Sequence, residues 1–262
     1  MSAPLTPRPA LAAEGPTRGS GVRRDGRPST ADGPGPRFGA VIAGIGYLAI
    51  FGLAIFANFG VRNRLVDLSD PTGTLAGLAA EEGMVRAALA AFVAVFAIDV
   101  VVAWALHVVL RVAAPAWSLL AAWSRLSYTV LLGVAAVFLF LAMQLAGAGA
   151  YASGIAPELR AALAATSLDA FDYAWLVGLV AFGLHLLVVG GILIGTRVGP
   201  RWLGVLLGIA GAAYIADTAA HTLLAGYAAY ADAFLAMVAL PSIVGELWLT
   251  VWLLARAGRR KD

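Results

Sequence analysis

The chain has 262 residues, of which 61% are hydrophobic and only 13% are charged. A soluble domain carries about 25% charged residues, so this composition excludes a water-soluble globular protein. The net charge of +3 comes from basic residues that mostly flank apolar blocks, which indicates membrane orientation and no nucleic-acid partner. Cysteine is absent, which excludes disulfides, thiolate metal sites and cysteine nucleophiles.

Residues 1–37 are rich in Pro, Gly, Ala and Arg, and they have no apolar face that could order them. We predict that this segment is a disordered cytoplasmic tail that can be removed without loss of folding. The adjacent Arg23 and Arg24 are also a feature of twin-arginine export signals. Here the apolar block begins only at Phe38 and is too long for the apolar region of such a signal, so the tail is the better interpretation.

Six long apolar blocks follow, each with the length that a bilayer-spanning helix requires. They cover residues 38–59, 84–110, 117–145, 171–195, 202–224 and 230–255. At about 1.5 Å rise per residue, each block crosses a hydrocarbon core of about 30 Å. A membrane β-barrel would instead show short segments of alternating hydrophobicity, which this sequence lacks. The predicted fold is an all-α polytopic transmembrane bundle of six helices within residues 38–257.

Basic residues are concentrated in the tail, in the second and fourth loops and in the C-terminal residues 258–262. An even number of spans places both ends of the chain on one side of the membrane. The excess of arginine predicts that this side is cytoplasmic. The two arguments are independent and agree on where the termini lie.

The first and third loops are long, and each contains a segment with a helical pattern. In the first loop, Asp70 before Pro71 has the form of an N-cap at the start of a short helix. In the third loop, residues 157–166 place Leu159 and Leu163 at helical spacing. Both segments are predicted to be short helices that lie on the outer membrane surface as lids.

Five ionisable residues fall well inside the predicted spans, where a charge costs at least about 2.5–3.5 kcal/mol. They are Asp99, Arg125, His185, Asp217 and Glu246. Polar neighbours should face the bundle interior with them; these are Tyr128, Tyr214, His221 and Ser242. Because intramembrane ionisable residues usually face a partner or a cavity, we take this set as the candidate ligand- or proton-binding cluster.

Counting residues along the spans places Asp99, His185 and Glu246 at nearly the same depth, with Arg125 somewhat deeper. A guanidinium group forms bidentate hydrogen bonds with a carboxylate. We expect Arg125 to pair with Glu246 and, as the second choice, with Asp99. The alternative is that Arg125 extends to the membrane interface and needs no buried partner.

Two interpretations of the cluster remain open. It is a structural ion pair that fixes helix packing, as polar contacts between membrane helices often are, or it is a binding site or proton relay. A metal site is disfavoured because no paired-histidine spacing is present, and a haem is disfavoured because His107 and His221 lie near opposite membrane faces. No metal and no cofactor are expected.

Two backbone features of the last two blocks affect packing. Pro241 removes the hydrogen bond to the Met237 carbonyl and is expected to kink its helix before Glu246. Three glycines are expected to let their helix approach a neighbour closely. They are Gly204, Gly208 and Gly211.

Several short motifs accompany this pattern. They are AGIGYL at 43–48, Arg125-Leu126, FGLH at 182–185, the run PRWLGVL from 200 that continues to Gly211, Tyr214 and Asp217, and Pro241, Gly245-Glu246 and Trp252-Leu253-Leu254. With them, residues 40–257 resemble the bacterial and archaeal membrane proteins of the family called domain of unknown function 4386. The resemblance implies a six-helix fold and a prokaryotic cytoplasmic membrane, and no activity, substrate or cofactor. The arginine-rich tail departs from the family pattern.

Three functions remain as hypotheses. In the first, the protein binds or moves a small ligand or a proton at a midplane polar pocket. In the second, it is a structural or partner-binding subunit whose polar network only sets helix packing. In the third, it is an intramembrane enzyme acting on a lipid or quinone, with His185 as acid or base. No phosphate-binding loop and no nucleophile elbow is present, and the two halves show no evident inverted repeat. The pattern favours the pocket, in a protein whose one predicted partner is the lipid bilayer.

Overall fold

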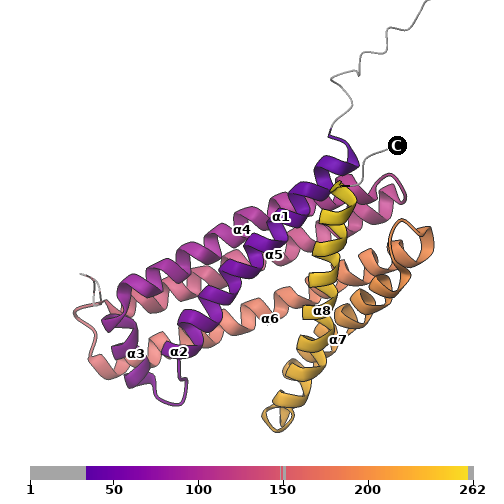
Figure 1. The fold of residues 1–262 in the computed structure, drawn as a ribbon. Coiled ribbons are helices and arrows are strands. Elements are labelled where there is room, and N and C mark those ends of the chain that lie inside the picture. Colours follow the sequence, from indigo (N-terminus) through magenta and orange to yellow (C-terminus); the bar gives the residue numbers. More distant parts are fainter. Residues whose placement is uncertain (1–33, 148, 150–151, 259–262) are drawn as a thin grey trace, which may run out of the picture. The chain divides into compact units, whose positions relative to one another are not determined.

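The structure, a computed structural model, describes residues 34–147, 149 and 152–258. In this part of the chain every regular element is a helix, and six helices are long and apolar enough to cross a membrane (Figure 1). The prediction of an all-α polytopic bundle is therefore confirmed. Most of the predicted tail, residues 1–37, and of the basic end, residues 258–262, lies outside the described residues.

The spans follow one another in chain order with few intervening elements. The first span, Pro36–Leu65, consists of α1 (Pro36–Ile55), a π-helical turn η1 (Phe56–Arg62) and α2 (Asn63–Leu65). The remaining elements are α3 (Pro71–Ala80), α4 (Glu82–Leu110), α5 (Pro115–Ala146), α6 (Pro157–Thr196), α7 (Arg201–Leu223), the 3₁₀ turn η2 (Tyr227–Ala229) and α8 (Ala231–Gly258).

Each spanning helix packs against the next one in the chain: α1 against α4, α4 against α5, α5 against α6, α6 against α7 and α7 against α8. Because α8 also packs against α1, the six spans close into a ring of neighbours. Two apolar clusters fill the interior, one toward each end of α4, α5 and α6. Ile50 and Tyr128 pack against both clusters, which places them where the clusters meet at the middle of the bundle.

The short helix predicted after Asp70 is confirmed as α3. The Asp70 carboxylate accepts the Gly73 amide at 2.9 Å and caps the helix, and Pro71 occupies its first turn. Leu75 and Leu78 of α3 are buried against the bundle. In the preceding loop, hydrogen bonds from Ser69 lower the pKa of Asp67.

The prediction of a separate short helix over residues 157–166 is wrong. This segment is the start of α6, a continuous helix of 40 residues that begins at Pro157. Glu158, Arg160, Asp169 and Asp172 interrupt the apolar pattern here, so hydropathy locates the beginning of the lipid-facing part and not the beginning of the helix. Similarly, the first span runs past residue 59 to Leu65 through the π-helical turn.

The end of the first span is tied to α6 by Arg62. Its guanidinium forms an ion pair with Asp172 and lies 5.2 Å from the centre of the Phe171 ring. Arg62 is the last residue of the π-helical turn, so this contact lies where the irregular turn ends.

Helices α6 and α7 approach closely at paired glycines, as predicted for Gly204 and Gly211. At the third predicted position, Gly208, an added Cβ would meet nothing within 4 Å. A Cβ atom on Gly190 would lie 2.5 Å from the Gly204 carbonyl oxygen, and one on Gly183 would lie 2.6 Å from the Gly211 carbonyl oxygen. Both contacts are with backbone, which has little freedom to move away. Small residues at these positions therefore bring the two helix backbones together.

Replacing Gly190 by Ala should destabilise the protein by roughly 1–3 kcal/mol, because the added methyl group overlaps the backbone of α7. The matched control is Gly191→Ala on the next residue, where nothing lies within 4 Å of an added Cβ. Unfolding of both variants in mild detergent is the measurement. Equal unfolding midpoints for Gly190→Ala and the wild type would contradict this packing of α6 on α7.

Candidate functional site

Arg125 of α5 is the centre of the polar cluster. It is only 1% exposed, although it is among the largest side chains in the bundle. Its Nε donates a hydrogen bond to Asp99 Oδ1 of α4 at 2.9 Å, and its Nη2 donates to the same oxygen at 2.5 Å. The two residues therefore form a fully buried ion pair between neighbouring helices.

The expected pairing of Arg125 with Glu246 is wrong, because the second choice, Asp99, is the partner. Helix α5 packs directly against α4, whereas α8 packs against α7 and α1. Asp99 and Glu246 lie at similar depths in the membrane. Which of them pairs with Arg125 is therefore determined by the order of the helices around the ring. Arg125 also does not extend to the interface, since its guanidinium is buried in the pair.

Two hydroxyl groups complete the ion pair. Thr129, one helical turn after Arg125, donates to the second carboxylate oxygen of Asp99, Oδ2, at 2.5 Å. Tyr47 of α1 accepts a hydrogen bond from Arg125 Nη1 at 2.6 Å. The guanidinium carbon also lies 4.7 Å from the centre of the Tyr47 ring and 5.3 Å from that of Phe182, within the range of cation–π attraction.

His185 of α6 is the fourth polar contact of this network and is fully buried. Its Nδ1 lies 2.8 Å from the Ala121 carbonyl oxygen, which only accepts, so Nδ1 carries the hydrogen. Its Nε2 lies 3.4 Å from Arg125 Nη1, which only donates, so Nε2 is the acceptor. The imidazole is therefore neutral, and it stacks on Phe182 at 5.7 Å.

A cavity of about 150 Å³ lies beside the network. It is lined by Ile50, Phe51, Ala54, Val95, Asp99, Arg125, Tyr128, Trp175, Leu179, Phe182, Tyr214 and Glu246. Five of these side chains are aromatic, and the only charged groups among the lining residues are Arg125, Asp99 and Glu246. Since Arg125 and Asp99 neutralise one another, the Glu246 carboxylate sets the charge of the cavity.

Glu246 differs from Asp99 in having no protein partner. Within the described part of the chain its carboxylate takes part in no hydrogen bond and in no ion pair, and Glu246 lines the cavity and is partly exposed. On the same helix, Ser242 donates to the Val238 carbonyl at 2.7 Å and Thr250 donates to the Glu246 carbonyl at 2.8 Å. These hydroxyl groups are thus occupied by their own backbone and leave the Glu246 carboxylate unpaired.

The structure brings together seven of the nine predicted site residues. Arg125, Asp99 and His185 lie in one network, and Tyr128, Tyr214 and Glu246 lie around its cavity. Ser242 is a hydrogen-bond partner of Tyr214 and also donates to its own helix. Asp217 and His221 belong to a different place, the end of α7. There Asp217 accepts a hydrogen bond from Tyr227 at 2.7 Å, and burial together with this bond raises the pKa of Tyr227 to about 12.

Three important residues were not among the predicted site residues: Tyr47, Thr129 and Trp175. Thr129 follows Arg125 by four residues and could have been found from this helical spacing. Tyr47 lies in a helix with no intramembrane charge, so nothing in its own segment indicated a polar contact. Within the described residues, no group of three His, Asp or Glu side chains is arranged to hold a metal ion.

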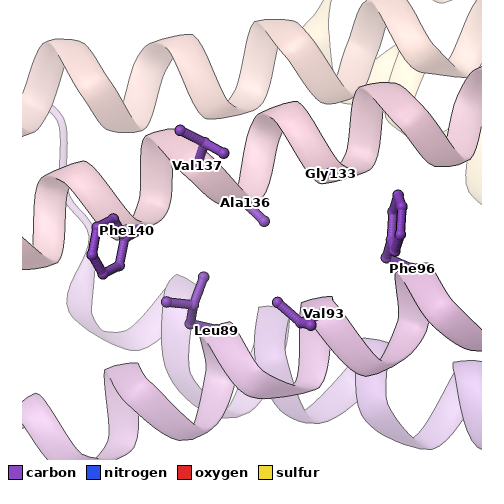
Figure 2. Close-up of a pocket in the computed structure, with 7 residues that line it drawn as sticks. All are labelled: Leu89, Val93, Phe96, Gly133, Ala136, Val137 and Phe140. Atoms are coloured by element: carbon purple, nitrogen blue, oxygen red, sulfur yellow. The ribbon is translucent and has the colours of Figure 1, made fainter.

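A second hollow, between α4 and α5, has a different chemistry (Figure 2). It measures about 320 Å³ and is lined by Leu89, Val93, Phe96, Gly133, Ala136, Val137 and Phe140. Val93 and Val137 are more than half exposed. Because no lining side chain offers a hydrogen bond or a charge, this hollow suits the apolar part of the bilayer and is not the candidate site.

The family described as Domain of unknown function (DUF4386) matches residues 42–257. The chain belongs to this family. The DUF4386 match includes four spans completely, most of the first and the last span, and the whole network from Tyr47 to Glu246. It confirms the resemblance that the sequence indicated. Comparison with curated proteins and with solved structures found no significant match.

Replacing Tyr47 by Phe should cost about 1.5–3 kcal/mol, because it removes a hydrogen bond to a charged group and keeps the aromatic ring. The control is Tyr230→Phe, which alters a 60% exposed tyrosine in the loop before α8. Free energies of unfolding are measured in mild detergent with increasing sodium dodecyl sulfate. A Tyr47→Phe value within about 0.5 kcal/mol of the control would contradict the contact with Arg125.

Proposed function

We propose that this protein is a membrane receptor or carrier for a small organic ammonium ion, which binds to Glu246 in the aromatic cavity in exchange for a proton. Glu246 carries this proposal, because it is a carboxylate that faces a cavity and has no partner among the described residues. An isolated carboxylate is costly to ionise inside a membrane, so a proton or a bound cation is needed to neutralise it.

The walls of the cavity favour a cation over an anion or a neutral polar molecule. Phe51, Trp175 and Tyr214 present aromatic rings to the same space as the carboxylate. Aromatic rings attract ammonium groups through their negative faces, and cages of such rings recognise methylated ammonium ions. Arg125 would repel a cation if it were free, but its charge is compensated by Asp99.

The volume limits the ligand to a small molecule. An apolar cavity of about 150 Å³ in another protein accommodates benzene, and the cavity beside Glu246 is of the same size. A trimethylammonium ion is smaller than benzene in its heavy-atom count and fits this limit. A lipid or a quinone head with its tail is larger than this space.

The enzyme hypothesis receives no support from His185. This side chain is fully buried, is not among the residues that line the cavity, and has both ring nitrogens engaged by Ala121 and Arg125. The structural hypothesis is favoured by one observation: the hydrogen bonds of Arg125 join α1, α4, α5 and α6. The network itself thus has a structural role, while Glu246 lies outside it.

Binding of trimethylammonium to the purified protein in detergent should be detectable by calorimetry and as a rise in melting temperature. Its affinity should fall as the pH is lowered, because protons compete for the same carboxylate, and each ion bound should release a proton into the buffer. Glu246→Gln should abolish binding and still fold, since no protein group relies on this carboxylate. The control is Glu158→Gln at the start of α6.

The proposal would be contradicted if the wild-type protein bound no ammonium ion in a series from methylammonium to tetramethylammonium. If Glu246→Gln were at the same time more stable than the wild type, the cavity would be a packing feature, and the structural hypothesis would replace the proposal. Binding that survives in Glu246→Gln would also contradict it, because the cation would then be held elsewhere.

A further inference from the structure

A second polar cavity lies at the end of the bundle where α6 passes to α7 and where α8 ends. It measures about 300 Å³ and is lined by Arg197, Val198, Gly199, Pro200, Trp252, Ala255 and Arg256. Two of the seven lining residues are arginines, and none is acidic. The cavity therefore has a positive lining, in contrast to the one beside Glu246.

The two arginines reach the cavity in different ways. Arg256 is held in place, because its Nη1 donates to the Val198 carbonyl oxygen at 2.8 Å and its guanidinium lies 5.4 Å from the Trp252 ring centre. Arg197 ends α6 with a φ of 55°, in the left-handed region, and its side chain is exposed. This backbone conformation turns the chain sharply toward α7, so that residues 197–200 form one wall of the cavity.

Because the cavity lies at the ends of membrane-spanning helices, we expect it near the lipid headgroups. Its walls come from the last turns of α8 and from the connection between α6 and α7. Trp252 lines it, and Trp202 beside it is 75% exposed, as expected for tryptophans at a membrane interface.

We propose that this cavity binds the phosphate-bearing headgroup of an anionic phospholipid. Guanidinium groups bind phosphate through two parallel hydrogen bonds, and basic pockets between membrane helices bind anionic headgroups. A free phosphate ion offers the same oxygens, but the interfacial position of the cavity brings lipid phosphates to it at high local concentration. The site is separate from the ammonium site and independent of it.

The test uses delipidated full-length protein and native mass spectrometry to measure the affinity for two lipids with the same chains, phosphatidylglycerol and phosphatidylcholine. The wild type should prefer phosphatidylglycerol. Arg197→Asn removes the charge with a residue that tolerates the left-handed conformation, and it should weaken phosphatidylglycerol binding about fivefold. Arg197→Lys should retain most of the binding.

Arg111→Asn is the matched control, because Arg111 follows α4 in an exposed loop at the same end of the bundle and does not line the cavity. This variant should bind phosphatidylglycerol like the wild type. Should Arg197→Asn not fold, as judged by its melting temperature, Arg256→Gln takes its place with the same expected loss.

Three results would overturn the proposal. Equal affinity for both lipids would show that charge is not recognised. An equal loss in Arg111→Asn would show a diffuse attraction to basic loops and not a site. Inorganic phosphate that displaces phosphatidylglycerol at equal concentration would show a site for the free ion.

Discussion

A buried arginine needs a counter-charge and several hydrogen-bond acceptors, and this requirement organises the centre of the bundle. Arg125 meets it with Asp99, Tyr47 and His185, which lie on three other helices. Removing one partner of such a buried pair typically costs about 3–5 kcal/mol, because the other charge is left without compensation. The relative positions of α1, α4, α5 and α6 are therefore coupled through one side chain.

The same constraint explains why one carboxylate of the cavity has no partner among the described residues. With Arg125 and Asp99 neutral as a pair, Glu246 is the remaining charged group among the lining residues. If Glu246 on α8 contacted Arg125, it would belong to the network and would not be an unpaired carboxylate. The position of α8 beside α1 and α7 keeps the Glu246 carboxylate separate from the Arg125–Asp99 pair.

The sequence predicted the number of spans, their helical class and most of the residues around the polar centre, because long apolar blocks and intramembrane charges are strong signals. It did not predict which carboxylate pairs with Arg125, since hydropathy gives depth along the membrane but not the order of helices around the bundle. For the same reason Asp217 was grouped with the centre, whereas it binds Tyr227 near the end of α7. Tyr47 was missed because its single hydroxyl leaves no pattern in an otherwise apolar helix.

The most direct test of the central ion pair is a double-mutant cycle on the free energy of unfolding, comparing Arg125→Met combined with Asp99→Leu and Arg125→Met combined with Glu246→Gln. The structure predicts that Arg125→Met alone is strongly destabilising and that Asp99→Leu recovers much of the loss, with a coupling energy well above the additivity error of about 0.5 kcal/mol. The cycle with Glu246→Gln should show a clearly smaller coupling. A coupling energy that is larger with Glu246 than with Asp99, or negligible with both, would contradict a bundle organised around the Arg125–Asp99 pair.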